Sequence, residues 1–560
     1  MSEIDRMRAW VFSTRSVLMC LAALGCGGLG SCVSMDTTSV EDRIEAATPR
    51  SRPRRVATQP ATLATATQPR STQSVSTSAL VESASSFIAT VEDAIFEALD
   101  NNRSLAVERL NPQIRRTAEQ EALAVFDPIL TAGMTYSRER TNLVPTTQVA
   151  EGVDAQVGAR TFLPTGTTVQ VDGTTSVLQG DFGQDDAWTS RAELTATQAL
   201  LQGAGLGVNL VSVRQARIDI LTSQYELRGF AQDLVAQVEE TYWDTVLAQR
   251  QIEIVQNAMT VAEQQYEETR EYIRVGKLAE TELAAAEAEV ALRREEMINA
   301  NSELETTRLK LWRLVNPQTV TPADTQIRLV TLPAIPEMEL DDVRLHVELA
   351  MRMRPDLNQA RLLVQRNELE LVRTRNGLLP KLDLFITLGG TGYAKSFGTS
   401  VRKTGDHNYD VLVGLSGEYP PLNREARTRN QRATLDRDQS LLALDNLAQL
   451  AEVDVRGAYI ELKRAQEQVR ATAATRRLQE EKLRAETEKF RVGKSTSLLV
   501  AAVQRDLLSS QITEVRAVVT HLKAIVELRR LEGSLLEYRG IACPGAQPVN
   551  LPTQRTDRGS

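Results

Sequence analysis

The sequence predicts a mainly helical protein with a smaller β-sheet part, built from two tandem copies of one structural motif. Three observations lead to this prediction. Segments of the second half repeat segments of the first, long proline-free stretches have a helix-forming composition, and shorter segments alternate apolar with polar residues. Only 4% of the 560 residues are aromatic, whereas 25% are charged. This composition favours long helices over a thick compact core.

The first 32 residues have the features of an export signal. Three arginines, the last of them Arg15, precede an apolar run at 17–24 that is too short to span a bilayer, and small residues then lead to Cys32. The stretch Leu29–Cys32 resembles a bacterial lipobox, which implies that Cys32 is acylated and becomes the N-terminus after cleavage. An ordinary cleaved signal is the alternative interpretation. In both cases the mature chain leaves the cytoplasm.

Residues 33–85 have no sustained apolar period and are rich in Ser, Thr, Ala, Arg and Pro, which predicts a flexible tether. Beyond the signal the sequence has one cysteine, Cys543, so no intrachain disulfide is expected in a lipidated chain. The formal net charge of -8 argues against a nucleic-acid partner, because phosphate binding depends on positive charge.

Two sets of matched residues show that the second half of the chain repeats the first. Pro128 matches Pro380, 252 positions later. Further along, Arg274–Lys277 recurs as Arg491–Lys494, 217 positions later. The segment between these two landmarks is therefore 35 residues shorter in the second copy, the difference of the two offsets. A length change confined to one segment marks that segment as loop-like or hairpin-like.

Helix starts are predicted at equivalent places in both copies. Thr90 and Asp93 have capping-box spacing before an apolar face, and Asp342 begins the equivalent helix of the second copy. Pro355 suits the first position of a further helix, because its missing N–H has no partner there in any case.

Long helices follow the variable segment in each copy. From Gly203 to Val275 no proline interrupts a stretch dense in Gln, Glu, Ala, Leu and Val, which predicts continuous helix of up to roughly 110 Å, dented at most at Gly229. A second proline-free stretch runs from Leu278 to Val315, and its counterpart follows Lys494. Each copy is therefore predicted to end in a long helical hairpin.

Between the helices the period changes to strict alternation, the pattern of strands. The first copy has alternating runs at Leu130–Tyr136, Val153–Ala159, Val169–Val171 and Ala192–Ala196, and the second has them at Leu382–Leu388 and Tyr409–Leu415. One apolar and one polar face suit strands between lipid and water, and they suit a half-buried soluble sheet equally well. We expect four barrel strands per chain, with the hairpin at 153–177 either inside the barrel or outside the cell as an extra loop. Four strands cannot close a useful barrel, whereas about twelve from three chains can, which predicts a homotrimer.

Two units of helix, strand pair and long helical hairpin, with Val275–Gly276 and Val492–Gly493 at the hairpin turns, resemble the TolC-type outer membrane factors. The similarity runs from about Thr90 to Tyr538. It implies a mainly α fold with a transmembrane β part, in which a trimeric α-barrel continues into one shared 12-stranded β-barrel. It also implies an outer-membrane channel: the exit duct of a tripartite efflux pump or a type I secretion system, which carries substrates passively from the periplasm to the outside.

The same resemblance implies functional residues and partners. The adaptor-docking tips would be Val275, Gly276, Lys277, Val492, Gly493 and Lys494. The partners would be two further copies of the chain, a periplasmic adaptor (membrane fusion protein), an inner-membrane transporter reached through the complex, and outer-membrane lipid, with no nucleic acid. The motif where a strand returns to helix departs from the family pattern at Ala199–Gly203 and at Pro420–Arg424.

A pore constriction is the least defined of these expectations. The family's acidic ring lies six and nine positions after the second-tip glycine, where this sequence has Leu499 and Ala502. Glu282, six positions after Gly276, is the candidate instead, because three carboxylates facing one lumen attract cations. A solvated glutamate on a helix surface is the alternative interpretation.

No catalytic residue, metal site or cofactor is predicted, and the chain is not expected to be an enzyme. The three histidines, His346, His407 and His521, have no metal-ligand spacing. Gly493–Ser495 resembles the end of a phosphate-binding loop, but Glu488 stands where its first glycine is required.

The expected divisions are a lipoprotein-type signal at 1–32, a tether at 33–85, a first repeat at 88–316, a proline-rich connector at 317–338, a second repeat at 339–538 and a tail at 539–560, disordered from Cys543. The alternative function is that of a periplasmic coiled-coil adaptor or a structural scaffold lipoprotein. An adaptor has one hairpin between paired strands, whereas here strands precede each of two hairpins. A scaffold would leave the alternation unexplained.

Overall fold

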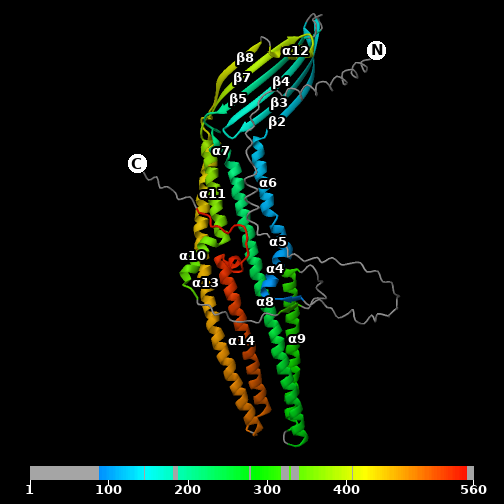
Figure 1. Ribbon diagram of the computed structural model, residues 1–560, viewed down its shortest axis with the longest axis vertical. Helices are drawn as coiled ribbons and strands as arrows, with labels where there is room; N and C mark the ends of the chain where they lie inside the picture. The colour runs from blue at the N-terminus through cyan, green and yellow to red at the C-terminus, as the bar shows by residue number, and fades with distance from the viewer. Residues whose placement is uncertain are drawn as a thin grey trace, which may run out of the picture. The chain divides into compact units, whose positions relative to one another are not determined.

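The structure, a computed structural model, describes residues 87–143, 146–180, 187–276, 279–316, 327–329, 340–405, 408–492 and 494–550, which all belong to the unit Ser78–Ser560. Figure 1 shows its long helices and its sheet. The predicted signal with Cys32, the tether, most of the connector, Lys277 and Gly493 lie outside the described residues.

The elements follow the predicted order of helix, strands and helical hairpin, twice. The first copy comprises β1 (Phe87–Ala89), α4 (Val91–Asn101), α5 (Arg103–Glu108), α6 (Asn111–Leu123), the 3-10 turn η2 (Ala124–Phe126), β2 (Ile129–Leu143), β3 (Thr146–Leu163), β4 (Thr167–Gly180), β5 (Ala187–Ala199), α7 (Leu206–Asn209), α8 (Val211–Arg274) and α9 (Thr281–Val315). The second comprises α10 (Val343–Met353), α11 (Pro355–Asn376), β7 (Lys381–Ala394), α12 (Phe397–Arg402), the 3-10 turn η3 (Lys403–Gly405), β8 (Tyr409–Glu418), α13 (Arg424–Arg491), α14 (Ser497–Glu532) and α15 (Leu535–Tyr538), and β6 (Ile327–Leu329) stands between the copies.

The predicted helix starts are confirmed. The Thr90 hydroxyl accepts the N–H of Asp93, and the Asp93 carboxylate accepts the N–H of Thr90, which closes a capping box on α4. The Asp342 side chain accepts the N–H of Arg344 at the start of α10, and Pro355 is the first residue of α11. Local sequence thus fixes where these helices begin.

The long helices are uninterrupted. α8 has 64 residues and α13 has 68, which corresponds to about 96 and 102 Å of helix. α8 continues through Gly229, where a Cβ would lie 3.6 Å from the ring of Pro355. Gly229 therefore lets α11 approach α8 closely, and it does not interrupt α8.

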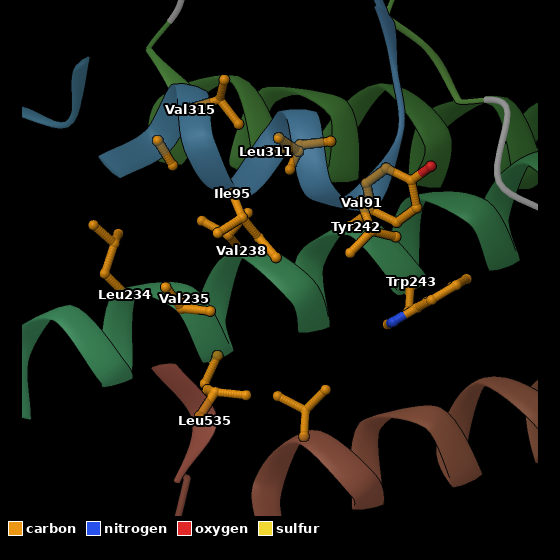
Figure 2. Close-up of a cluster of buried hydrophobic side chains, with 14 of the residues drawn as sticks. Val91, Ile95, Leu234, Val235, Val238, Tyr242, Trp243, Leu311, Val315 and Leu535 are labelled. Carbon is orange, nitrogen blue, oxygen red and sulfur yellow. The ribbon is translucent and has the colours of Figure 1, made fainter. Parts of the chain in front are cut away.

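The main hydrophobic core surrounds the middle of α8. Figure 2 shows Ile95 of α4 against Val238 of α8, with Leu311 of α9 on the same side and Leu535 of α15 on the other. Tyr242 is fully buried in this cluster, and its repeat counterpart, Tyr459 of α13, packs against a second cluster made by α10, α13 and α14. The repeated short helices therefore brace the long ones at equivalent points.

The sheet corrects the predicted number of strands. Six antiparallel strands are hydrogen-bonded in the order β2-β3-β4-β5-β7-β8 in the described residues, so each chain supplies six strands where four were expected. The hairpin predicted at 153–177 is β3 and β4, and it lies within the sheet between β2 and β5. The expected total of twelve barrel strands from three chains was built on four strands per chain, whereas this sheet has six. The alternation identified the strands but carried no information on their pairing.

The C-terminal tail is irregular but ordered as far as Asn550, so the expectation of disorder from Cys543 is wrong. Ile541 and Cys543 pack against the main core. The N–H of Val549 donates to Asn358 at 2.9 Å, and the Asn550 carbonyl accepts the Gln365 amide at 3.1 Å. The tail lies along α8 and α11 because it is tied to them by its own backbone groups.

Candidate functional site

The sheet has one polar and one apolar face, which the strand register defines. The polar face carries Thr135, Gln156, Asp172, Arg191, Thr387 and Asp410, and the apolar face carries Met134, Val157, Val171, Leu194, Leu388 and Val413. Residues directly opposite each other in an antiparallel pair share a face, so each face is continuous across all six strands.

On β7 burial is the reverse of that in a water-soluble protein, and apolar side chains on the apolar face are exposed on all six strands. On β7, Thr387 is 8% exposed, whereas its neighbours Ile386 and Leu388 are 40% and 45% exposed. On β8, Val411, Val413 and Leu415 are all more than half exposed. A contiguous exposed apolar surface of this kind marks contact with lipid or with another protein. None of the described helices combines the length and apolar character that a bilayer-spanning helix requires.

Polar side chains on the polar face bond to one another. The Arg191 guanidinium donates to both carboxylate oxygens of Asp410 at 2.8 Å, to Glu193 at 2.9 Å and to Thr391 at 3.2 Å. Gly389 stands between these groups, since a Cβ there would lie 2.5 Å from the Arg191 guanidinium. This network joins β5 to β7 and β8 and was not predicted, because its partners are up to 219 positions apart.

A short helix covers part of the apolar face. α12 packs on β5 and β7: the Trp188 and Phe397 rings meet edge to face at 5.7 Å, and the Ser190 and Ser400 hydroxyls bond at 2.7 Å. Gly392 makes this contact possible, because a Cβ there would lie 2.0 Å from the Ser400 carbonyl oxygen. The connection between β7 and β8 is thereby held against the sheet.

The sheet is fastened to the helices where the β3–β4 turn meets the start of α7. Gly166 has φ 89° in that turn, a backbone conformation that favours glycine. The Asn209 amide donates to the carbonyls of Pro164 at 3.1 Å and Gly203 at 2.8 Å, and Gly203 N–H donates to Asn376 at 2.7 Å. The turn of the hairpin predicted at 153–177 therefore lies at Leu163–Gly166.

The predicted tips lie at the ends of the two helical hairpins. Val275 ends α8 and is 59% exposed, and Gly276 follows with φ 75°. Val492 ends α13 at 66% exposure, and Lys494 is also exposed. The second tip is closed by Glu486, which accepts Ser495 at 2.5 Å and Lys489 at 2.9 Å; these bonds hold the pKa of that carboxyl below its usual range.

Glu282, the candidate for a pore constriction, does not lie free on a helix surface. Its carboxylate accepts the hydroxyl of Ser497, a buried residue at the start of α14. The bond links α9 of the first hairpin to α14 of the second, close to both tips. Glu289 and Arg505 join the same two helices at 3.7 Å. Sequence reasoning missed Ser497 because the pair is 215 positions apart.

A second buried charge lies farther along α9. Arg293 is 3% exposed and bonds to Glu289 and, at 2.6 Å, to Glu296, one turn away on either side. The spacing of three and four positions was visible in the sequence as a helix-surface pattern, but its burial was not. Within the described ranges, no three His, Cys, Asp or Glu side chains are grouped so as to hold a metal ion.

Comparison with known proteins gives a family match in the second copy of the repeat. Residues 347–534 match the family model described as outer membrane efflux protein. A search of curated proteins finds no match to the sequence.

Solved structures match over most of the described chain. The outer membrane protein VceC of Vibrio cholerae is 15% identical with a TM-score of 0.59, and the match covers 79% of this chain and 96% of that one. The MtrE outer membrane channel of Neisseria gonorrhoeae, in its open state, is 18% identical with a TM-score of 0.58 over 80% and 89% of the two chains. The CmeC outer membrane channel of Campylobacter jejuni is 15% identical with a TM-score of 0.58 over 80% and 86%. At these identities the likeness shows a shared fold, and the predicted class of long helices with a sheet is confirmed.

Proposed function

We propose that this chain is one protomer of a trimeric outer-membrane channel, because residues 347–534 match the outer membrane efflux protein model and the chain has the TolC-like fold predicted from its repeat. The channel is the exit duct of a tripartite efflux pump or a type I secretion system. It works passively: its own residues bind no cofactor and catalyse no reaction, and the driving force comes from an inner-membrane transporter.

The observation that carries this proposal is the exposed apolar face of the sheet. Thr387 is buried while Ile386 and Leu388 on either side are exposed, and the exposed apolar face extends over all six strands. In lipid, strands must satisfy every backbone N–H and C=O, which requires a closed barrel. A single six-stranded sheet has two free edges, and further copies of the chain remove them.

The hairpin tips are the proposed contact with a periplasmic adaptor. The described tip residues, Val275, Gly276, Val492 and Lys494, lie where α8 leads to α9 and α13 leads to α14, and they are exposed. Lys277 and Gly493 complete the proposed tips in the sequence. Exposed valines beside lysines offer an apolar contact with a cationic rim. Glu282 is proposed to stand at the constriction, where its bond to Ser497 holds the two hairpins together.

The remaining elements of the proposal concern anchoring. Cys32 would carry the acyl chains, and residues 33–85 would connect that anchor to the first repeat, which begins near residue 88. The periplasmic adaptor and the scaffold lipoprotein remain the rival functions. Neither of these functions explains why an apolar face of the sheet is exposed.

Two neighbouring positions on β8 test the channel. Val413 on the apolar face and Leu412 on the polar face are 61% and 56% exposed, so neither arginine variant disturbs packing within one chain. We expect Val413→Arg to lower the yield of trimer in outer-membrane fractions, because a cation facing lipid costs about 2–4 kcal/mol at the bilayer midplane, and Leu412→Arg to leave it near the parent level. Equal yields for the two variants would contradict a lipid-facing sheet and favour a soluble scaffold.

A further inference from the structure

The two copies of the repeat differ by one complete β-hairpin. β7 begins at Lys381, 252 positions after Ile129 of β2, and Leu412 of β8 stands 217 positions after Thr195 of β5, so β2 corresponds to β7 and β5 to β8. These are the same two offsets that relate the flanking helices. β3 and β4 have no counterpart, and the 35 residues from Thr146 to Gly180 that contain them equal the length difference between the copies.

The additional hairpin is a full part of the sheet. β3 pairs with β2 from Arg160 opposite Ile129, and β4 pairs with β5 as far as Leu178 opposite Ala187. The alternation continues through it, since Val157 and Val171 lie on the exposed apolar face at 45% and 50% exposure. An external loop would need neither the continuous ladder nor an apolar face.

The number of strands per chain determines how copies can join. Six is even, so β2 and β8, the two outer strands, run in opposite directions. β8 of one copy can therefore pair with β2 of the next in the same antiparallel sense that all the other neighbours have, and closure leaves no unpaired edge in lipid. The occupant of each free edge is a second copy of this chain.

We propose that three copies close an eighteen-stranded barrel in which β8 pairs with β2 of the neighbouring copy. This rests on the proposed function, and it makes the pore wider than the family's twelve strands would. Barrel diameter grows roughly in proportion to strand number, so at equal tilt the pore is about one and a half times as wide. Barrels of this size leave an aqueous channel, which suits bulky hydrated solutes.

The charges lining the wider pore come partly from the extra hairpin. Asp154 and Asp172 of β3 and β4 lie on the polar face together with Glu193, Asp383 and Asp410, whereas Arg160 and Arg191 are cationic. Carboxylates are in excess on this face. The substrates best suited to the pore are therefore bulky solutes that are neutral or cationic.

The edge pairing can be tested by disulfide crosslinking of the full chain in a Cys543→Ser background. Within one chain, the residues paired directly across the sheet from Val413 lead to the beginning of β2. In a closed barrel the strands are tilted and the pairing between neighbouring copies is staggered. The partner of Val413 in the neighbouring copy is therefore expected several residues further along β2. Val413→Cys is combined with Met134→Cys or with Tyr136→Cys, which share its face. Covalent trimers from one of the two pairs are expected, with monomers from each single variant. A trimeric channel that neither pair crosslinks overturns the proposed edge.

Pore width is tested against a matched deletion. Removal of residues 146–180 leaves β2 to pair with β5, as β7 pairs with β8 in the second copy, and gives the family's four strands per chain. In planar bilayers, polymers added on the barrel side should enter the parent channel up to a larger size than they enter the deletion variant, and the constriction at the tips does not limit this entry. Equal polymer size limits for the two channels overturn the proposal.

A point-variant pair covers the case in which the deletion variant does not fold. Val157→Arg on the apolar face of β3 should reduce trimer yield in the outer membrane several-fold, and Gln156→Arg on its polar face should not. Equal yields would place the hairpin outside lipid and overturn the inference. Absence of a trimer from the outer membrane in the parent itself would instead count against the proposed function, so the two failures are distinguishable.

Discussion

Leucines of the helical middle and leucines of the sheet have different surroundings: Leu311 of α9 is 1% exposed, whereas Leu415 of β8 is 65% exposed. Around α8 the apolar side chains of the core point inward. On the sheet, polar groups bond to one another and apolar groups face out. One chain thus follows two rules of burial, which is expected if water surrounds one part and lipid the other.

Charged side chains also differ in burial between the helical middle and the sheet. In the helical middle, Glu239 of α8 is fully buried and is paired with Arg539, which follows α15. On the sheet, Arg191 is about one-third exposed on its polar face and has several partners. A buried charge needs its partner for stability, whereas a partly exposed charge depends on its partner less.

The largest effect is expected from breaking the buried pair. Arg539→Ala leaves the Glu239 carboxylate buried without the guanidinium that bonds it at 2.7 Å, which should cost about 3–5 kcal/mol and greatly reduce folded protein. The midpoint of urea denaturation in detergent measures the loss. Arg464→Ala is the control, because its pair with Glu461 is half exposed and should contribute little to stability. Similar midpoints for the two variants would refute a special role for burial.

The core itself is tested on one helix. Leu311 and Leu309 of α9 are two positions apart, at 1% and 56% exposure. Leu311→Ala should cost about 2–4 kcal/mol, because it leaves a cavity among α4, α8 and α9, whereas Leu309→Ala should change stability little. The thermal midpoints of the two purified variants give the comparison. A large loss for Leu309→Ala would show instead that this surface is buried by a neighbouring copy.

The sheet should respond in conduction more than in stability. Arg191→Ala removes the cation that holds Asp410 and Glu193, so the polar face becomes more acidic and cation preference should rise. Because Arg191 is partly exposed, the loss of stability should be about 1 kcal/mol or less. The reversal potential in a salt gradient measures the preference.

A neutral control for that prediction lies directly opposite Arg191. Thr174 of β4 shares the polar face, and Thr174→Ala leaves the charge of the pore unchanged. If its reversal potential moves as far as that of Arg191→Ala, the effect does not come from charge. An unchanged potential in Arg191→Ala would show that this face does not line the conducting path.

The arrangement of helices and strands was largely predictable because the repeat supplies the same information twice. Thr90 and Asp342 mark equivalent helix starts, and the Val-Gly pairs that begin at Val275 and Val492 mark equivalent tips. The hairpin of β3 and β4 was predicted, but its place between β2 and β5 was not, since alternation defines the faces of a strand but not its neighbours. The same limit applies to the site: Glu282 was identified, but its partner Ser497 lies on another hairpin.

The tail shows a different reason for a missed feature. Cys543 begins a segment without apolar period, and such segments are commonly disordered. Here the segment is held by backbone groups that bond to side chains of the second copy, among them Asn358 and Gln365. Cys543 itself is half-buried, and burial raises the pKa of its thiol. The order of the tail depends on hydrogen-bond donors and acceptors that the tertiary structure brings near it. Local sequence cannot show these groups.

The smallest expected effect is a change of stability with pH in the helical middle. Burial lowers the pKa of His521 on α14, so the folded state binds its proton less readily than the unfolded state does. The stability that the neutral ring contributes is complete above the unfolded pKa of about 6.5 and is lost as the pH falls through the lower folded value. His521→Leu should therefore lose less stability than the parent between pH 7.5 and 5.5, by about 1 kcal/mol or less, as measured by denaturation midpoints at the two values. The difference should vanish between pH 7.5 and 8.5, and a variant that is equally sensitive to acid would assign the loss to other groups.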